Sequence, residues 1–201
     1  MPEFIVRAHS APVNPQSFID AVGTGAHVEY LAQIVVNTLF VSQGHRRDDS
    51  LTLVLENASD YSRTLEITGD RLASIGGMSE GEVIALLADA LYAGASLGKE
   101  EAATAESGIV VRTISFERLV KRRLETGPVL LLDRKGTDIR DYDCPVDATF
   151  LLTDHVPLPK NLRKSFLRQG VQSLSLGPVM LHASQCVVLV QNEYDRLYSG
   201  R

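Results

Sequence analysis

Polar residues follow three apolar runs of the chain, and at each of these places a small molecule could be held. Asp133 follows the run 129–132, Asp154-His155 follow the run 148–152 and Thr153, and the segment 175–178 follows the run 171–174. Runs of this kind are typical of strands in a parallel sheet, where ligands bind beyond the carboxyl ends of the strands. If the three ends converge, backbone amides and carbonyls would frame one pocket without any strongly charged residue.

Three clusters of cationic residues are the candidates for binding a polyanion. They are His45-Arg46-Arg47, Lys121-Arg122-Arg123, and the set Lys160, Arg163, Lys164 and Arg168, which recurs at helical spacing. The formal net charge of −5 gives no global attraction to nucleic acid or to an anionic membrane, so local patches must carry any such binding. The alternative is that all three clusters are solvated faces.

Several common chemistries find no support in the motifs. The segment 23–28 holds only part of a dinucleotide-binding fingerprint and is interpreted as a turn, and no phosphate-binding P-loop occurs. The five histidines lack metal-ligand spacing, so we expect no metal site. Two cysteines, Cys144 and Cys186, exclude both a disulfide framework and a four-cysteine site. No serine lies in the setting of a serine hydrolase.

Hydrophobic periodicity predicts strands that alternate with helices. The predicted strands are 4–8, 51–55, 129–132, 148–152 and 171–174, and the predicted helices are 28–41, 82–91, 116–124 and 159–168. Ser79 is a plausible N-cap for the second helix, with Glu82 three residues on. The pattern indicates an α/β fold with a mostly parallel sheet flanked by helices. The acidic, alanine-rich segment 100–107 is expected to be a mobile loop.

The C-terminal segment is more apolar than a tail on the surface would be. Five apolar residues, 186–190, follow the Gly177-Pro178 turn. Apolar residues at a 3–4 spacing from Val179 to Leu197 predict a buried helix with Pro178 in its first turn, where its missing N–H is tolerated. A strand over 186–190 is the alternative.

The length and composition indicate one globular domain over residues 1–201. The chain has 201 residues, of which 44% are hydrophobic, and this suffices for a substantial core. No apolar run is long enough to cross a bilayer, and the N-terminus lacks the pattern of a secretory signal. We therefore expect a cytoplasmic protein without a membrane partner.

Together these motifs resemble a known family. The residues that carry the resemblance are Arg46-Arg47-Asp48 after a helix, a strand ending at Leu132-Asp133, Asp154-His155 after an apolar strand, and LSLGPVMLHASQCVVLVQNEYDR. Over essentially the whole chain the sequence resembles the archaeal tRNA pseudouridine N1-methyltransferases, a family of the SPOUT superfamily of S-adenosylmethionine-dependent RNA methyltransferases, and looks like one of its bacterial relatives.

The resemblance implies an α/β-knot fold. In SPOUT proteins the C-terminal helix passes through a loop to form a trefoil knot, a rare exception to the rule against threading, and the chains pair as homodimers through it. The knot-forming cofactor region would then span about 127–201. Burial in such a knot would explain the apolar tail.

The resemblance also implies the positions that hold S-adenosylmethionine in the knot. They are Leu132 on the adenine side, Leu176, Gly177 and Leu181 in the loop that wraps the cofactor, Thr153, and Cys186 as a lining residue. Thr153 departs from the glycine usual before Asp-His, and its Cβ disfavours a positive φ. Ordinary core packing is the alternative role for Leu132 and Cys186.

Methylation of pseudouridine N1 requires that its proton leave around the time of attack, so a nearby carboxylate or histidine could act as the base. We predict Asp48 in this role, with Arg46 and Arg47 holding RNA phosphate, and tRNA as the expected RNA. An internal Arg–Asp pair is the alternative for this cluster, and His155 could instead contact the substrate. Competing functions are a protein that binds RNA or the cofactor without this activity, and a methyltransferase for another RNA base.

Overall fold

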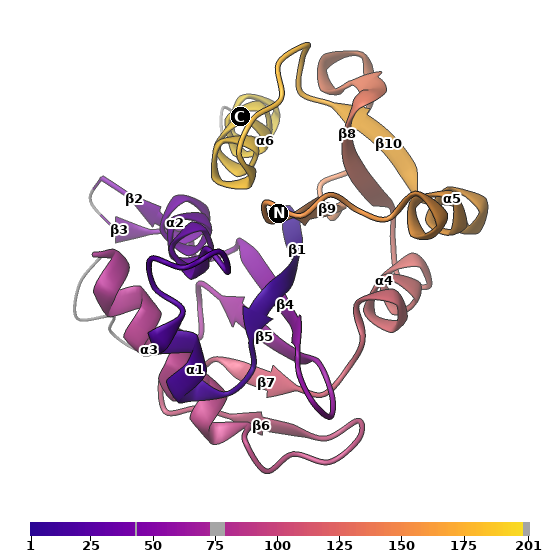
Figure 1. The fold of residues 1–201 in the computed structure, drawn as a ribbon. Coiled ribbons are helices and arrows are strands. Elements are labelled where there is room, and N and C mark those ends of the chain that lie inside the picture. The colour runs from indigo at the N-terminus through magenta and orange to yellow at the C-terminus, as the bar shows by residue number, and fades with distance from the viewer. Residues whose placement is uncertain (43, 73–78, 199–201) are drawn as a thin grey trace.

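The computed structural model describes residues 1–42, 44–72 and 79–198, and one eight-stranded sheet runs through them (Figure 1). Its strands are β1 (Glu3–Pro12), β4 (Ser50–Asn57), β5 (Arg63–Thr68), β6 (Ala102–Thr104), β7 (Val110–Arg112), β8 (Val129–Asp138), β9 (Thr149–Thr153) and β10 (Gln172–Ser175). The helices are α1 (Pro15–Asp20), α2 (Val28–Leu39), α3 (Glu80–Ala93), α4 (Phe116–Leu124), α5 (Lys160–Gln169) and α6 (Ala183–Tyr198), with a 3₁₀ turn η1 (Ile139–Asp141). A two-stranded ribbon, β2 (Phe40–Val41) with β3 (Gly44–His45), stands apart from the sheet.

The strand order is β10-β8-β9-β1-β4-β5-β7-β6. All pairings from β10 to β4 are parallel, and those from β4 to β6 are antiparallel. The register sets Val6 of β1 between Leu53 of β4 and Leu152 of β9. The prediction of a mostly parallel sheet flanked by helices is confirmed, and the parallel part places the carboxyl ends of β8, β9 and β10 on one side.

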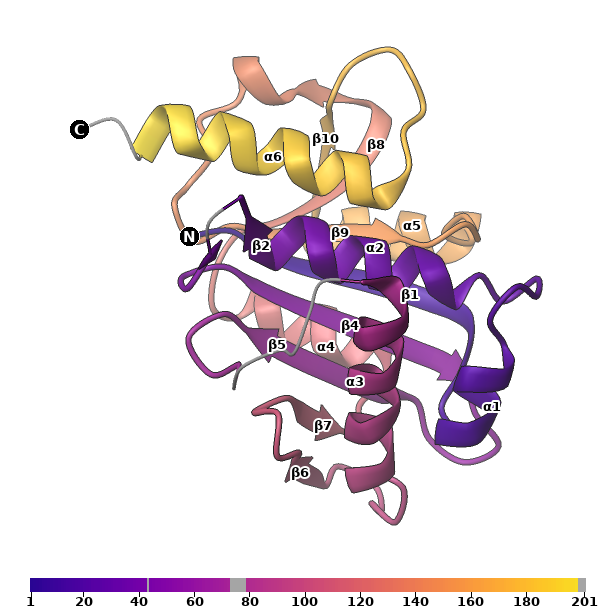
Figure 2. The same cartoon turned by 90° about the vertical axis from the view of Figure 1, so that its left-hand side faces the viewer.

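Helices cover both faces of the sheet, which explains why the central strands are apolar throughout (Figures 1 and 2). Helices α1, α2, α3 and α6 lie on one face, and α4 and α5 lie on the other. In β9, Phe150 and Leu152 pack into the core under the first group, whereas Leu151 packs into the core with Phe116 of α4 and Phe166 of α5. Alternate residues of the same strand therefore serve two separate cores.

The apolar C-terminal segment is a helix that packs beside α2 (Figure 2). Val187, Val190 and Tyr194 of α6 are fully buried. The Tyr194 hydroxyl donates a hydrogen bond to the carbonyl of Pro145 at 2.6 Å, and its ring meets Phe150 edge-on. The predicted helix is confirmed and the alternative strand over 186–190 is wrong.

The predicted start of this helix at Pro178 is wrong by five residues. The helix begins at Ala183, and the residues from 176 to 182 form a loop. Gly177, immediately before the predicted start, has a φ of +117° and begins a turn, and the residues that follow it as far as His182 are also not helical. The Gln185 side-chain oxygen accepts a hydrogen bond from the backbone N–H of His182 and so satisfies a free donor at the helix start.

The other predicted helices and strands are present, most of them with first or last residues that differ from the prediction. Helix α2 ends at Leu39, two residues before the predicted end, because the chain enters the β2–β3 ribbon. The capping box at α3 is confirmed, since Ser79 and Glu82 exchange their hydrogen bonds. The segment 100–107 is not only a loop, because it contains β6, which pairs with β7. No helix in the described ranges is long and apolar enough to span a membrane.

Candidate functional site

The three strand ends picked out from the sequence meet at one cavity of about 590 Å³. Its walls come from the ends of β8, β9 and β10, the loop 176–182, and the first turns of α2 and α6. All six residues predicted to hold the cofactor line it: Leu132, Thr153, Leu176, Gly177, Leu181 and Cys186. A volume of this size is typical of sites for small molecules and cofactors.

An irregularity in β8 opens the floor of the cavity. Ser173 of β10 pairs with Leu131, but the next residue, Leu174, pairs with Thr137, so five residues of β8 leave the ladder between these points. Gly136 lies in this excursion, and a Cβ there would come within 2.5 Å of the Leu174 backbone nitrogen. Glycine is therefore required where β8 returns to β10, and the excursion brings Leu132 and Asp133 to the cavity.

The loop after β10 is fixed by its own hydrogen bonds. The buried Ser175 hydroxyl accepts a hydrogen bond from the Gly177 N–H and lies 3.2 Å from the Gly177 carbonyl oxygen, to which it donates. The φ of +117° at Gly177 is a conformation that residues with a Cβ rarely adopt. This turn directs the following residues, from Val179 to His182, across the cavity.

Thr153 fits where the family pattern has glycine. It is the last residue of β9, and it is not among the residues with a positive φ in the described ranges. The expected conflict between a Cβ and a positive φ therefore does not arise at this position.

Two carboxylates of different character lie in the cavity wall. Burial raises the pKa of Asp133, but hydrogen bonds from the Lys135 backbone and from Arg163 Nε, at 2.6 Å, outweigh this effect, and the net pKa is lowered. Burial raises the pKa of Asp154, and the hydrogen bond from the Val156 N–H only partly opposes it. Asp154 is therefore the cavity carboxyl that holds a proton more readily.

Aromatic rings from three distant segments gather in the cavity wall. The rings of His27 and Tyr30 are stacked at 4.9 Å, His155 meets His27 edge-on at 4.6 Å, and His182 lies 5.7 Å from Tyr30. His27 has a φ of +50°, which is uncommon for a residue with a side chain. No pattern in the sequence predicted this cluster, because its members come from segments far apart in the chain.

The cavity is chemically suited to a ligand that combines apolar and polar parts. Leucine is the commonest residue in its walls, and the ends of β8, β9 and β10 bring backbone groups to it. Within residues 1–42, 44–72 and 79–198, no three His, Cys, Asp or Glu side chains are grouped so that they could hold a metal ion.

Arg46, Arg47 and Asp48 do not line this cavity. They lie between β3 and β4, beside the C-terminal half of α6, where Arg46 pairs with Asp195. Arg47 and Asp48 are exposed. The next residue, Asp49, is buried and accepts a hydrogen bond from Gln191 of α6 at 2.7 Å. Within one chain, the structure thus separates the predicted RNA and base residues from the predicted cofactor residues.

Residues 1–198 match a family model described as "Putative SAM-dependent RNA methyltransferase". The chain belongs to this family. Among curated relatives of these RNA methyltransferases, proteins of Vibrio vulnificus and Vibrio parahaemolyticus are 45% and 47% identical to it over 195 residues, 97% of this chain and 98% of theirs. Both are named "Putative pseudouridine methyltransferase". The family resemblance seen in the motifs is confirmed, as is the prediction of S-adenosylmethionine as cofactor.

A solved structure agrees with the fold of this RNA methyltransferase. The crystal structure of Archaeoglobus fulgidus Nep1 bound to S-adenosylhomocysteine aligns with a TM-score of 0.63 over 98% of this chain and 99% of that chain. The two sequences are 14% identical, so the likeness concerns the fold.

Proposed function

We propose that this RNA methyltransferase transfers the methyl group of S-adenosylmethionine to N1 of pseudouridine in tRNA. The observation that carries the proposal is the convergence of three strand ends on one cavity lined by all six residues predicted for the cofactor. The names of the Vibrio relatives support pseudouridine as the target nucleotide. The proposal assigns residues 1–201 to one cytoplasmic methyltransferase domain, with residues 127–201 as its knotted cofactor region.

The cavity residues fit the proposed cofactor in kind. Leu132, Leu176 and Leu181 offer apolar surface for an adenine ring, and Cys186 completes that wall. The Gly177 carbonyl oxygen can accept a second hydrogen bond besides the one from Ser175, and backbone groups at Thr153 also lie at the cavity wall, so both positions can contact polar parts of the molecule. When bound, S-adenosylmethionine supplies a methyl group on a positively charged sulfur.

The reaction needs alignment and a base. As the bond from N1 to the methyl carbon forms, the carbon–sulfur bond breaks and sulfur keeps its electron pair, while the N1 proton passes to a base. Holding the two reactants in line within a site that excludes water can supply much of the rate. We assign the base to Asp48 and the binding of RNA phosphate to Arg46 and Arg47.

A homodimer through α6 would bring the separated halves of this site together. Val188 and Leu189 of α6 are 45% and 38% exposed, so the outer face of this helix presents apolar surface. The helix has 16 residues and is about 24 Å long, with the cavity at its N-terminal end and Arg46 near its C-terminal end. Two-fold pairing of α6 would place Asp48 of one protomer near the cavity of its partner.

The activity is tested with a tRNA stem-loop that carries pseudouridine or uridine at one position. We expect mass spectrometry to find one methyl group, on N1, only in the RNA with pseudouridine. Asp48→Asn should lower the rate at least about 100-fold, in line with the typical contribution of a general base. The matched control is Asp89→Asn, a change at an exposed position of α3, which should leave the rate unchanged.

Mixing two inactive variants tests whether the site is shared between protomers. Asp48→Asn supplies an intact cavity, and Gly177→Val supplies an intact Asp48. If the site is shared, an equal mixture of exchanged subunits regains about a quarter of the wild-type rate, because half of the dimers are mixed and each has one complete site. A site made within one chain would give no recovery.

Two other functions would give different results in these assays. Methyl transfer to a nucleotide other than pseudouridine would identify a methyltransferase for another base. Binding of S-adenosylmethionine and RNA without any transfer would identify a binding protein. The absence of calorimetric heat with S-adenosylmethionine at high protein concentration would overturn the enzymatic proposal.

A further inference from the structure

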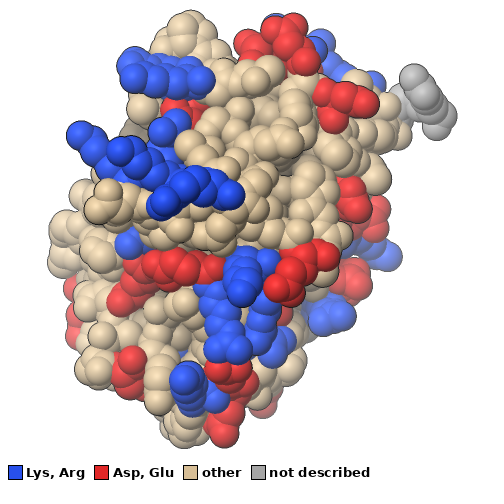
Figure 3. All heavy atoms as spheres, turned by 90° about the vertical axis from the view of Figure 1, so that its right-hand side faces the viewer, with Lys and Arg blue, Asp and Glu red and all other residues tan. Residues whose placement is uncertain are grey.

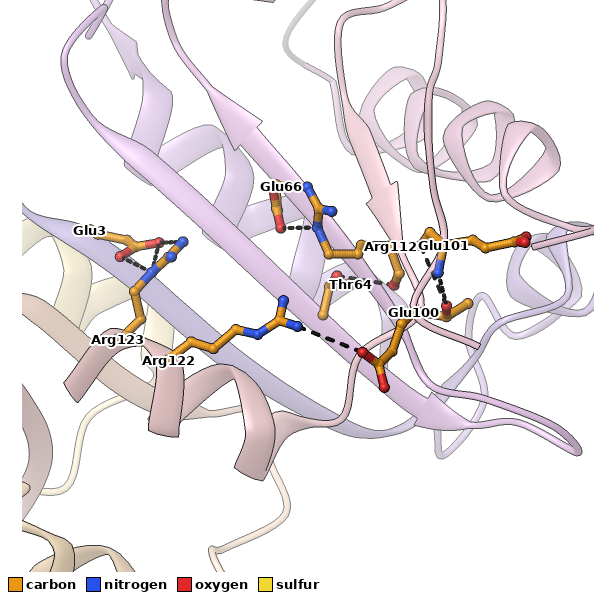
Figure 4. A network of polar contacts seen from close by, with 9 residues as sticks. Glu3, Thr64, Glu66, Glu100, Glu101, Arg112, Arg122 and Arg123 are labelled. Carbon is orange, nitrogen blue, oxygen red and sulfur yellow. Dashed lines mark hydrogen bonds and ion pairs between the residues drawn. The ribbon is translucent and has the colours of Figure 1, made fainter. Parts of the chain in front are cut away.

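The cationic clusters of the sequence differ in how many of their side chains form ion pairs in the structure. Two of the three residues in the cluster Lys121-Arg122-Arg123 on α4, Arg122 and Arg123, pair with acidic residues (Figure 4). Arg123 makes hydrogen bonds of 2.7 to 3.0 Å to the Glu3 carboxylate, and Arg122 lies 4.0 Å from Glu100. These ion pairs join α4 to β1 and to the segment before β6, so this cluster serves the fold.

Helix α5 presents its cations differently. Lys160, Lys164 and Arg168 are exposed and recur every four residues, so they lie along one face of the helix. None of the three forms an ion pair with any residue in the described part of the chain. The buried face of α5, with Phe166, packs on the sheet and fixes the direction of the cationic face.

The surface shows the same difference between basic groups with and without acidic neighbours (Figure 3). One group of basic side chains lies at the upper left, at the level of α5, with few acidic atoms among them. A second group lies in the centre, and acidic side chains flank it on both sides. On a protein with a net charge of −5, the group at α5 is a local concentration of positive charge.

The cationic face of α5 is continuous with the cavity. Arg163, on the same helix, and Arg134, at the turn of β8, both line the cavity wall. Arg163 is held there by Asp133, whereas Arg134 and the next residue, Lys135, are exposed and form no ion pair within the described ranges. Positive charge therefore extends from the cavity along about 12 Å of helix, from Lys160 to Arg168.

We propose that Lys160, Lys164 and Arg168, together with Arg134 and Lys135, bind phosphates of the substrate RNA outside the nucleotide that is methylated. This surface is defined as the α5 track. The proposed role of the α5 track rests on the proposed function, because it takes the bound RNA to be the substrate. Arg134 and Arg163 line the cavity wall, so RNA whose target base enters the cavity comes close to this surface, and unpaired lysines and arginines are the groups that neutralise phosphates. The α5 track then gives affinity for long RNA without selecting the base.

The test compares two triple variants that lose the same charge. K160Q/K164Q/R168Q removes three cations of the α5 track, and R71Q/K99Q/K121Q removes three exposed cations elsewhere. Binding to a fluorescein-labelled tRNA transcript is followed by anisotropy at several salt concentrations. We expect the first variant to bind at least about 10-fold more weakly at low salt. The slope of log Kd against log salt should also fall by about 2 to 3, because each lost phosphate contact lowers that slope by about 0.7 to 0.9. The control should match the wild type.

Three outcomes would overturn the proposal. Equal losses in the two variants would show a bulk charge effect, and unchanged binding in both would show that α5 faces away from the RNA. Retained RNA binding with lost binding to vesicles of anionic lipid would assign the surface to a membrane. Thermal melting of each variant checks its fold, which changes at exposed positions should preserve. Because RNA binding is measured without methyl transfer, failure of the proposed reaction leaves this test intact.

The substrate assay adds a second readout. The first variant should raise KM for full-length tRNA and leave kcat within about twofold, because uniform binding is lost while the reacting groups stay in place. A fall in kcat with unchanged KM would contradict a role in phosphate binding.

Discussion

The guanidinium of Arg46 is clamped by the carboxylate of Asp195, 149 residues away in sequence, through two hydrogen bonds of 2.8 and 2.5 Å. The hydrogen bond and charge of Asp195 raise the pKa of Arg46 against the effect of burial, and the same contact lowers the pKa of Asp195. The pair connects the segment before β4 to the C-terminal turns of α6. One of the two arginines predicted to bind RNA therefore also holds the helix that was predicted to be buried.

Alanine substitution of Arg46 or of Asp195 separates the proposed RNA binding by Arg46 from its contact with α6. Arg46→Ala and Asp195→Ala should each cost no more than about 1 kcal/mol of stability, because Asp195 is partly exposed and solvent screens the pair. Only Arg46→Ala should weaken RNA binding, since Asp195→Ala leaves the guanidinium in place and free. Thermal melting and anisotropy with tRNA measure the two effects. Equal losses of RNA affinity in both variants would mean that Arg46 acts only by positioning α6.

Gly177→Ala should weaken cofactor binding with little effect on the rest of the fold. An alanine at a φ of +117° is strained by about 1 to 3 kcal/mol, so the free loop should relax to another conformation. Binding must then restore the strained conformation, and each 1.4 kcal/mol of this cost corresponds to a tenfold loss of affinity. Calorimetric titration with S-adenosylhomocysteine should therefore show a Kd about 10-fold higher or more. Gly81→Ala is the control, because Gly81 is helical and no atom lies within 4 Å of an added Cβ. An unchanged Kd for Gly177→Ala would place the cofactor away from this loop.

The two cysteines should react slowly but respond differently to the cofactor. Burial raises the pKa of both Cys144 and Cys186 to about 11, so only about one thiol in a thousand is ionised at pH 8. Cys186 lines the cavity, whereas Cys144 is buried beneath Tyr194 and Tyr198. We expect S-adenosylhomocysteine to slow alkylation by iodoacetamide at Cys186 alone, as read by peptide mass spectrometry. Protection of neither cysteine, or of both equally, would count against the cofactor position.

The sequence predicted those parts of the site that follow from a local period and a topological rule. Apolar runs at 129–132 and 148–152 predicted buried parallel strands, and the rule that ligands bind at the carboxyl ends of such strands then predicted the cavity. Strands β5 and β7 were not predicted, because charged residues such as Glu66 and Arg112 interrupt their apolar pattern; these two residues pair with each other across the two strands.

Features that depend on contacts between distant segments could not be read from local pattern. The stacked rings of His27 and Tyr30 meet His155 only because β9 ends beside the start of α2. Helix α6 begins only at Ala183, because the residues from Val179 to His182 instead cross the cavity formed by the ends of distant strands. The neutralisation of Arg123 by Glu3 likewise joins residues 120 positions apart, so the sequence alone could not separate a structural cluster from the free cations of α5.

Asp49 should make the stability of the fold depend on pH in the acidic range. Burial raises the pKa of this carboxyl, and neither the hydrogen bond from Gln191 nor the charge of Arg46, 3.9 Å away, offsets the effect. The folded state therefore holds the proton more tightly than the unfolded state does. The resulting stabilisation is present at pH values below the pKa of an unfolded aspartate and is lost as the pH rises through the folded pKa.

Asp49→Asn removes this titration and keeps an oxygen that can accept from Gln191. Relative to the variant, the wild type should lose stability as the pH rises above about 4, with a slope of at most about 1.4 kcal/mol per pH unit, the limit for one proton. Urea unfolding of the wild type and of Asp49→Asn at several pH values measures the difference. A wild type that instead gains stability with rising pH, relative to Asp49→Asn, would contradict this prediction. Arg46 and Gln191 would then stabilise the ionised carboxylate of Asp49 more than burial penalises it, and the ionised Asp49 would help to hold α6 in place.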